Sequence, residues 1–239
     1  PTITDCLITD NQFHGLYSNN GAGSHSQMTI DNNEFSSNVG AAVCTTGYIH
    51  NITGSHGSDN GQDCILVRGG DVYGDCTWYD QDLPFVINNN VTIRNNAKLT
   101  IGSGAVVKFK PHVGLLISTS STYGRLSAVG TASDPITFTS NAASPAPGDW
   151  SGIYFNQYAD ASNLTFCTIE YGGYNYDANL YLNSANPTIQ NCVIQHSSDY
   201  GIYLNNAYPT ITDCLITDNQ SHGLYSNNGA GSHSQMTID

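Results

Sequence analysis

Positively charged side chains are scarce in this sequence. Its 239 residues contain six Lys and Arg against nineteen Asp and Glu, which gives a formal net charge of −13 at pH 7. A surface of this sign repels nucleic acid and anionic membranes. We therefore expect no nucleic-acid partner, and the acidity suits an extracellular or cell-surface protein, or one that meets cations.

Long apolar runs are also missing. No stretch comes near the ~20 apolar residues that a membrane-spanning helix needs, so we expect no membrane insertion in this segment. Only 10% of the residues are charged, and the polarity comes instead from Asn, Ser, Thr, Asp and Gly. These residue types favour turns over helices, so the composition argues against a helical protein.

The sequence does contain a long internal repeat. Residues 1–31 and 209–239 are identical except for Phe13 in the first stretch and Ser221 in the second, which sets a period of 208 residues. A shared fold does not force such identity, because many sequences satisfy one fold. We therefore infer a recent duplication and a tandem array.

The repeat predicts how the chain is organised. Pro1 begins inside one patterned segment and Asp239 stops inside another, so we expect the chain to be part of a longer one. Residues 1–70 would be the C-terminal coils of one copy, and residues 71–239 most of the next copy in one continuous solenoid. A lone domain with a duplicated end is the alternative.

A shorter repeat of 22–27 residues runs inside the long one. Each unit has an apolar residue, a Cys three positions later and an Ile two positions after that, followed by a second short strand such as "GIYL" at 201–204. The three clear examples are Leu164/Cys167/Ile169, Ile189/Cys192/Ile194 and Ile211/Cys214/Ile216. Short alternating strands that match their neighbours position for position predict stacked coils.

The predicted fold is therefore all-β: a right-handed parallel β-helix, or β-solenoid, with about nine coils in each 208-residue period. Each coil leaves backbone groups unpaired above and below, and pairing with the next coil satisfies them. The right-handed sense follows the general bias of parallel crossovers.

Three runs carry a resemblance to a known family. "VTIRNNAKLTIGSGAVVKF", "GRLSAVGTASDPITFTS" and "GDWSGIYF", followed by Cys- and Asn-rich coils, resemble the parallel β-helix repeats of large bacterial and archaeal cell-surface proteins. The resemblance covers about residues 76–239 and again 1–50. It implies an extracellular filament whose partners are further copies end to end, with lateral fibre contacts or glycans beside them. β-Helices host lyases, adhesins and passive stalks alike, so it implies fold more than function.

Catalytic constellations are not apparent. A lyase-like site needs Arg or Lys beside an Asp cluster, but all six cations lie between residues 68 and 125, outside the regular coils. The "DD" and "RIK" motifs of polygalacturonase-like enzymes do not occur, and "HGL" at His14 and His222 is typical of turns. We predict that the protein is not an enzyme, with a polysaccharide lyase or hydrolase as a third alternative.

The cysteines predict a column inside the solenoid. Cys167, Cys192 and Cys214 would stack about 4.8 Å apart, and Cys6 is the copy of Cys214. Parallel in-register Cβ vectors do not favour the torsion of a disulfide, so we expect reduced, buried thiols. Cys64 and Cys76 flank a short irregular loop, where a disulfide is an open alternative.

A column of tyrosines is the most distinctive predicted surface feature. If Ile202 and Leu204 point inward, Tyr203 points outward, because side chains alternate along a strand. The equivalent positions are Tyr154, Tyr181 and Tyr225, with Tyr17 in the preceding copy. The rings either stack only on one another or form a platform for sugar rings or a neighbouring filament.

Cofactors and modifications have weaker signals. No metal motif is present and no cofactor is expected, although Ca²⁺ at loop carboxylates stays open. Those carboxylates are Asp59, Asp63, Asp71 and Asp75, or Asp80 and Asp82. The glycosylation sequons, which matter only if the source glycosylates, begin at Asn51, Asn90, Asn163 and Asn219.

Taken together, these patterns favour a structural segment of an extracellular fibre, stalk or sheath. A carbohydrate-binding surface adhesin is the second hypothesis, and it depends on the tyrosine column.

Overall fold

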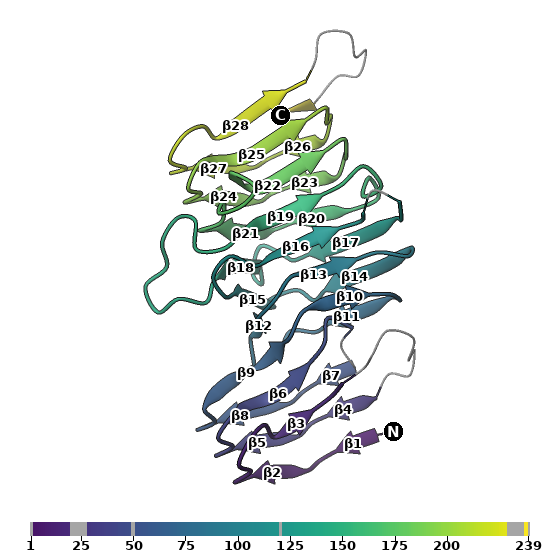
Figure 1. The fold of residues 1–239 in the computed structure, drawn as a ribbon, viewed down its shortest axis with the longest axis vertical. Coiled ribbons are helices and arrows are strands. Elements are labelled where there is room, and N and C mark those ends of the chain that lie inside the picture. The colour runs from purple at the N-terminus through teal and green to yellow at the C-terminus, as the bar shows by residue number, and fades with distance from the viewer. Residues whose placement is uncertain (1, 20–27, 49–50, 120, 229–236, 239) are drawn as a thin grey trace.

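The computed structural model describes residues 2–19, 28–48, 51–119 and 121–228, and the backbone of residues 237–238. In these ranges the chain forms 29 β-strands and no helix, and every strand pair is parallel. The strands wind into a β-solenoid of about nine turns, which confirms the predicted parallel β-solenoid (Figure 1). The described part of the chain therefore has no helix long and apolar enough to span a bilayer.

One sheet runs along the whole solenoid and takes one strand from each turn. This nine-stranded sheet contains, in spatial order, β3 (Leu16–Tyr17), β6 (Ala41–Thr45), β9 (Gln62–Val67), β12 (Phe85–Ile87), β15 (Val106–Phe109), β18 (Ile136–Ser140), β21 (Cys167–Glu170), β24 (Val193–Gln195) and β27 (Leu215–Thr217).

Two seven-stranded sheets form the other faces of the C-terminal turns. The first, called here the tyrosine sheet, contains β10 (Gly70–Val72), β13 (Val91–Ile93), β16 (Gly114–Ile117), β19 (Gly152–Phe155), β22 (Ala178–Asn183), β25 (Tyr200–Asn205) and β28 (Leu224–Asn227). The second, called here the threonine sheet, contains β11 (Cys76–Trp78), β14 (Ala97–Ile101), β17 (Gly124–Val129), β20 (Asn163–Thr165), β23 (Thr188–Gln190), β26 (Thr210–Thr212) and β29 (Thr237–Ile238).

Two short sheets belong to the N-terminal turns. One contains β1 (Thr2–Thr4), β4 (Thr29–Asp31) and β7 (Asn51–Thr53), and the other contains β2 (Leu7–Thr9), β5 (Glu34–Ser36) and β8 (His56–Ser58). Among the described strands, only the nine-stranded sheet joins these turns to the rest by a hydrogen-bonded ladder, through the pairing of β9 with β12 (Figure 1).

The interior is a continuous apolar column, as the alternating strands require. In the tyrosine sheet, for example, Leu115, Ile153, Leu180 and Ile202 follow one another in register and are fully buried. Larger side chains fill the wider turns: Trp150 stacks on Phe109 with a ring-centroid distance of 4.0 Å. Like residues thus lie over like, and the core has no break between turns.

Asn and Asp are frequent because the corners need them. The same corner of successive turns has a positive φ at Asn191 (52°) and Asp213 (53°), a conformation that Asn and Asp tolerate better than most residues. Buried Asn side chains also bond one turn to the next. Asn38 donates through Nδ2 to Asn60 Oδ1 (2.8 Å) and accepts at Oδ1 from Asn11 Nδ2 (2.8 Å). These bonds hold neighbouring corners in register.

Candidate binding surface

The tyrosine column forms on the outer face of the tyrosine sheet. Tyr154, Tyr181, Tyr203 and Tyr225 are paired in register on β19, β22, β25 and β28. The successive ring centroids are 5.1, 4.7 and 5.2 Å apart. Tyr225 is 37% exposed and the other three are half-buried, so the rings share their faces and present their edges and hydroxyls.

Two further tyrosines widen this column into a surface. The Tyr176 ring lies 4.9 Å from the Tyr154 ring, and the Tyr200 ring lies 4.7 Å from the Tyr225 ring. Sequence analysis did not predict either, although Tyr200 precedes Tyr203 by three positions on the same strand. Burial raises the pKa of Tyr154 and of Tyr176, so both hydroxyls stay protonated and can donate hydrogen bonds at neutral pH.

A column of amides runs beside the rings. Asn183, Asn205 and Asn227 pair in register two positions after the tyrosines. Asn205 Nδ2 donates to Asn183 Oδ1 (2.9 Å), and Asn183 Nδ2 donates to the Tyr154 hydroxyl (2.9 Å). Ring edges, tyrosine hydroxyls and amides side by side suit a ligand that carries many hydroxyl groups.

Tyr17 does not belong to this column, which corrects the prediction. It lies in the nine-stranded sheet, paired with Cys44, and it is 57% exposed. Its ring stacks on His14 at 6.0 Å, and the Arg68 guanidinium lies over it at 4.6 Å from the ring centroid. The sequence copy Tyr225 has the same strand position, but its strand lies in a different sheet.

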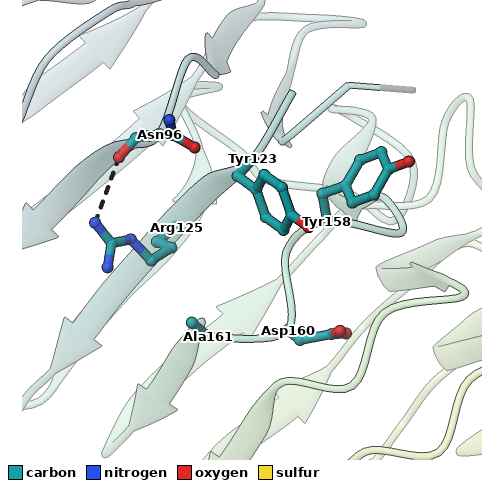
Figure 2. A pocket seen from close by; sticks show the side chains of 6 residues that line it. All are labelled: Asn96, Tyr123, Arg125, Tyr158, Asp160 and Ala161. Atoms are coloured by element: carbon teal, nitrogen blue, oxygen red, sulfur yellow. Dashed lines mark hydrogen bonds between the residues drawn. The ribbon is translucent and has the colours of Figure 1, made fainter. Parts of the chain in front are cut away.

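A pocket of about 420 Å³ opens at a corner between the tyrosine and threonine sheets (Figure 2). Tyr123 and Tyr158 form one wall, with ring centroids 4.8 Å apart and planes tilted by 50°. Arg125 donates to the backbone carbonyl of Asn96 (3.3 Å), and Asp160 accepts from the backbone N–H of Asn186 (2.8 Å). Its residues lie in irregular corners far apart in sequence, so sequence reasoning missed the pocket.

The predicted cysteine column is brought together by the fold. Cys167 and Cys192 are buried and Cys214 is half-buried. Cys6 does not join them, which corrects its prediction as a buried thiol: it is exposed in the first turn, where its neighbour one turn on is Asn33. All are free thiols. Each thiol donates to the carbonyl oxygen two residues earlier, as from Cys192 Sγ to Gln190 O at 3.2 Å. A hydrogen bond with Cys167, together with burial, raises the pKa of Cys192 to about 12.

The buried Cys192 thiol makes stability depend on alkaline pH. The folded pKa of Cys192 lies near 12, above the 9.0 of an ordinary thiol, so its contribution is complete below pH 9 and is lost as the pH rises toward 12. We expect the free energy of unfolding to fall by about 1 kcal/mol per pH unit in that window because of this thiol. Urea unfolding at about pH 8 and about pH 10 measures the slope.

Cys192→Ala should flatten this slope, whereas Leu215→Ala, at an exposed position without a titrating group, should leave it unchanged. An unchanged slope in Cys192→Ala would contradict the assignment of the alkaline loss of stability to Cys192.

The disulfide considered between Cys64 and Cys76 is not formed. Both are buried thiols, but they lie on opposite sides of the sheet layer. Cys76 on β11 packs in the main core, whereas Cys64 on β9 belongs to a separate outer cluster with Cys44, Leu66 and Val86. The two cysteines are close in sequence, but their side chains point to opposite sides of the sheets, which the sequence does not show.

The loop carboxylates considered for Ca²⁺ are mostly engaged with other groups. Asp71 forms an ion pair with Arg94 and accepts from the Tyr73 hydroxyl (2.7 Å), and Asp82 contacts His56 (2.5 Å). Burial, followed by the charge of Asp134, raises the pKa of Asp80. Within the described ranges, no three His, Cys, Asp or Glu side chains are grouped to hold a metal ion.

The four sequon asparagines differ in availability. Asn90 is exposed, although its Oδ1 accepts from the Gly114 N–H (2.8 Å), while Asn51 and Asn163 are half-buried at strand starts. Asn219 Nδ2 donates to the carbonyls of Ile194 (3.2 Å) and Thr217 (3.0 Å). A glycan on Asn219 would replace one of the two N–H donors that make these bonds, one of which joins two turns, so this position is a structural asparagine.

Fold and surface together define a parallel β-solenoid with an aromatic outer face. Comparison with known proteins agrees: residues 70–181, just under half of the chain, match the family described as "Pectate-lyase like beta helix domain". The match begins at Gly70, the first residue of β10, where the tyrosine sheet also begins.

A relative in Drosophila melanogaster is similar over a shorter stretch. The chain is 34% identical to "Protein bark beetle" over 74 residues, which is 31% of this chain and 2% of that protein. The chain therefore spans a very small part of this relative. No solved structure matches the chain.

Proposed function

We propose that this chain is a structural segment of an extracellular rod, stalk or sheath built from end-to-end copies of the 208-residue repeat. The supporting observation is the register at its two ends. β1 pairs with β4 through Thr2↔Thr29 and Ile3↔Ile30, and β26 pairs with β29 through Thr210↔Thr237 and Ile211↔Ile238. These are the same residues one period apart, so each repeat can stack on the preceding coil in the same way.

The surface charge fits this role. A net charge of −13 keeps neighbouring rods apart in solution, and it makes lateral association depend on cations that bridge them. The partners proposed are therefore further copies along the axis, with salt-dependent contacts between rods.

Small-angle X-ray scattering on an extended chain tests the proposal. Repeating residues 32–239 once after Asp239 adds one period, or eight turns at about 4.8 Å each, so the maximum dimension should grow by roughly 40 Å. The 239-residue chain is the matched control. A second copy that folds back beside the first, with little gain in length, would contradict the rod.

A second candidate function is saccharide binding by a surface adhesin. Two observations favour it: the tyrosine surface with its amide column, and the pocket that combines Tyr123, Tyr158 and Arg125. In the pocket, aromatic rings can pack against the C–H faces of a sugar, and on the tyrosine surface the amides and ring hydroxyls can bond sugar hydroxyls. We propose no catalytic role, and turnover of an acidic polysaccharide would replace both candidates with an enzyme.

The adhesin candidate predicts two separable losses on a glycan array. Tyr203→Ala removes the centre of the tyrosine surface, and Tyr123→Ala removes one wall of the pocket. Whichever site binds, its variant should bind at least about tenfold more weakly, since one stacking contact contributes roughly 1.4 kcal/mol. Tyr79→Ala, at a 38% exposed tyrosine outside both sites, is the control. Binding that survives both substitutions would contradict this candidate.

A further inference from the structure

The repeated segment does not return to the same sheet after one period. Starting at Leu16 in the nine-stranded sheet, eight steps of strand register lead to Ile216. The sequence copy of Leu16 is Leu224, eight residues further along the chain. Leu224 pairs with Ile202 in the tyrosine sheet. One period is therefore eight turns plus one strand when it is followed along this ladder.

The neighbouring repeated strand changes sheet in the same direction. β2 lies in a short N-terminal sheet, whereas its copy β27 lies in the nine-stranded sheet. The first repeated strand, β1, behaves differently. It begins the short sheet β1-β4-β7, and β7 lies against β11 of the threonine sheet. Its copy, β26, also lies in the threonine sheet, so β1 and β26 lie on the same face of the solenoid. Of the three repeated strands compared, two therefore lie in a different sheet from their copies, and one lies on the same face as its copy.

A single irregular turn causes the shift. β7 and β11 lie against each other in successive turns, and the chain advances by four strands between them, whereas the other turns advance by three. The additional strand is β10, which begins at Gly70. Gly69 and Gly70 have φ values of +89° and +97°, which glycine adopts without a Cβ clash. On another corner β8 ends its sheet against the next turn, where Leu83 approaches Gly57 so closely that a Cβ there would lie 2.5 Å from its Cδ2.

We propose that, in the array, the tyrosine sheet of one copy continues as the nine-stranded sheet of the next copy. This inference rests on the proposed end-to-end stacking. Because Tyr17 pairs with Cys44 in this chain, its copy Tyr225 pairs with Cys44 of the following copy. The ring column then ends, since Leu66 and Val86 occupy the next outward positions of that ladder.

The tyrosine surface therefore moves to another sheet in each copy. Successive surfaces do not join into one stripe along the rod. A flat, rigid partner that covers one surface cannot reach the next one by the same approach. In the proposed rod, the tyrosine surfaces of successive copies therefore face different sides.

Electron cryomicroscopy of the extended chain, with residues 32–239 repeated once, tests this arrangement. We expect Tyr225 to pair with the second copy's Cys44, and the two copies of Tyr203 to lie in different sheets of the rod. Stacked copies whose tyrosine columns form one straight ladder would overturn this inference and leave the rod intact. Copies that do not stack end to end would overturn the rod, and the inference with it.

Discussion

Replacing Trp150 with Ala is expected to lower the free energy of unfolding by roughly 3–5 kcal/mol. Trp150 is fully buried, its ring stacks on Phe109, and its Nε1 donates to the carbonyl oxygen of Glu170 at 2.8 Å. Truncation leaves a cavity in a wide turn, and it also removes the donor that satisfies a carbonyl. Urea unfolding followed by circular dichroism measures the loss.

Leu215→Ala is the matched control, because Leu215 is 57% exposed on the outer face. It should change the free energy of unfolding by less than about 0.5 kcal/mol. A Trp150→Ala protein as stable as this control would mean that the wide turn repacks without Trp150, and that the core is not built as described.

Val86→Pro is expected to uncouple the N-terminal turns from the rest of the rod. Val86 lies inside β12, which pairs with β9 in the ladder that joins the two parts. Proline inside a central strand removes a ladder donor and costs about 3 kcal/mol or more. Hydrogen exchange in residues 28–48 and 51–67 should accelerate by roughly a hundredfold or more, while exchange in residues 163–227 changes little.

The control for this variant is provided by the repeat itself. Phe13→Ser places at position 13 the residue found at the equivalent position 221, and Phe13 is 79% exposed. It should leave exchange unchanged in both parts. Equal acceleration along the whole chain in Val86→Pro would show that the turns unfold as one unit and that the β9–β12 pairing has no special role.

The fold was predictable because its signal is repeated in every turn. Alternating apolar residues, together with Asn and Asp at corners that need a positive φ, define coils without knowledge of distant contacts. The same signal placed Tyr154, Tyr181, Tyr203 and Tyr225 in one column. Local patterns suffice when each residue's neighbours are the equivalent residues one turn away.

The failures share a cause as well. Tyr17 and Tyr225 have almost identical sequence surroundings but lie in different sheets, because an added strand more than 50 residues away from Tyr17 changes the count of strands. Cys64 and Cys76 point to opposite sides of the sheets for a related reason: the direction of a side chain depends on register, which an irregular loop hides. The Tyr123–Tyr158 contact joins two corners whose sequences have no common pattern.

The strand added at Gly70 also bears on how the proposed rod would carry a load. If every sheet ended at the same level, no backbone ladder would cross the junction between copies, and only side-chain packing would hold the copies together. Here the tyrosine sheet begins at β10 and would run on through the nine-stranded sheet of the next copy, so each ladder overlaps the ladder that starts after it. Because of this overlap, tension in the proposed rod would pass between copies through a continuous hydrogen-bonded backbone ladder, and within each copy it would pass through the β9–β12 pairing.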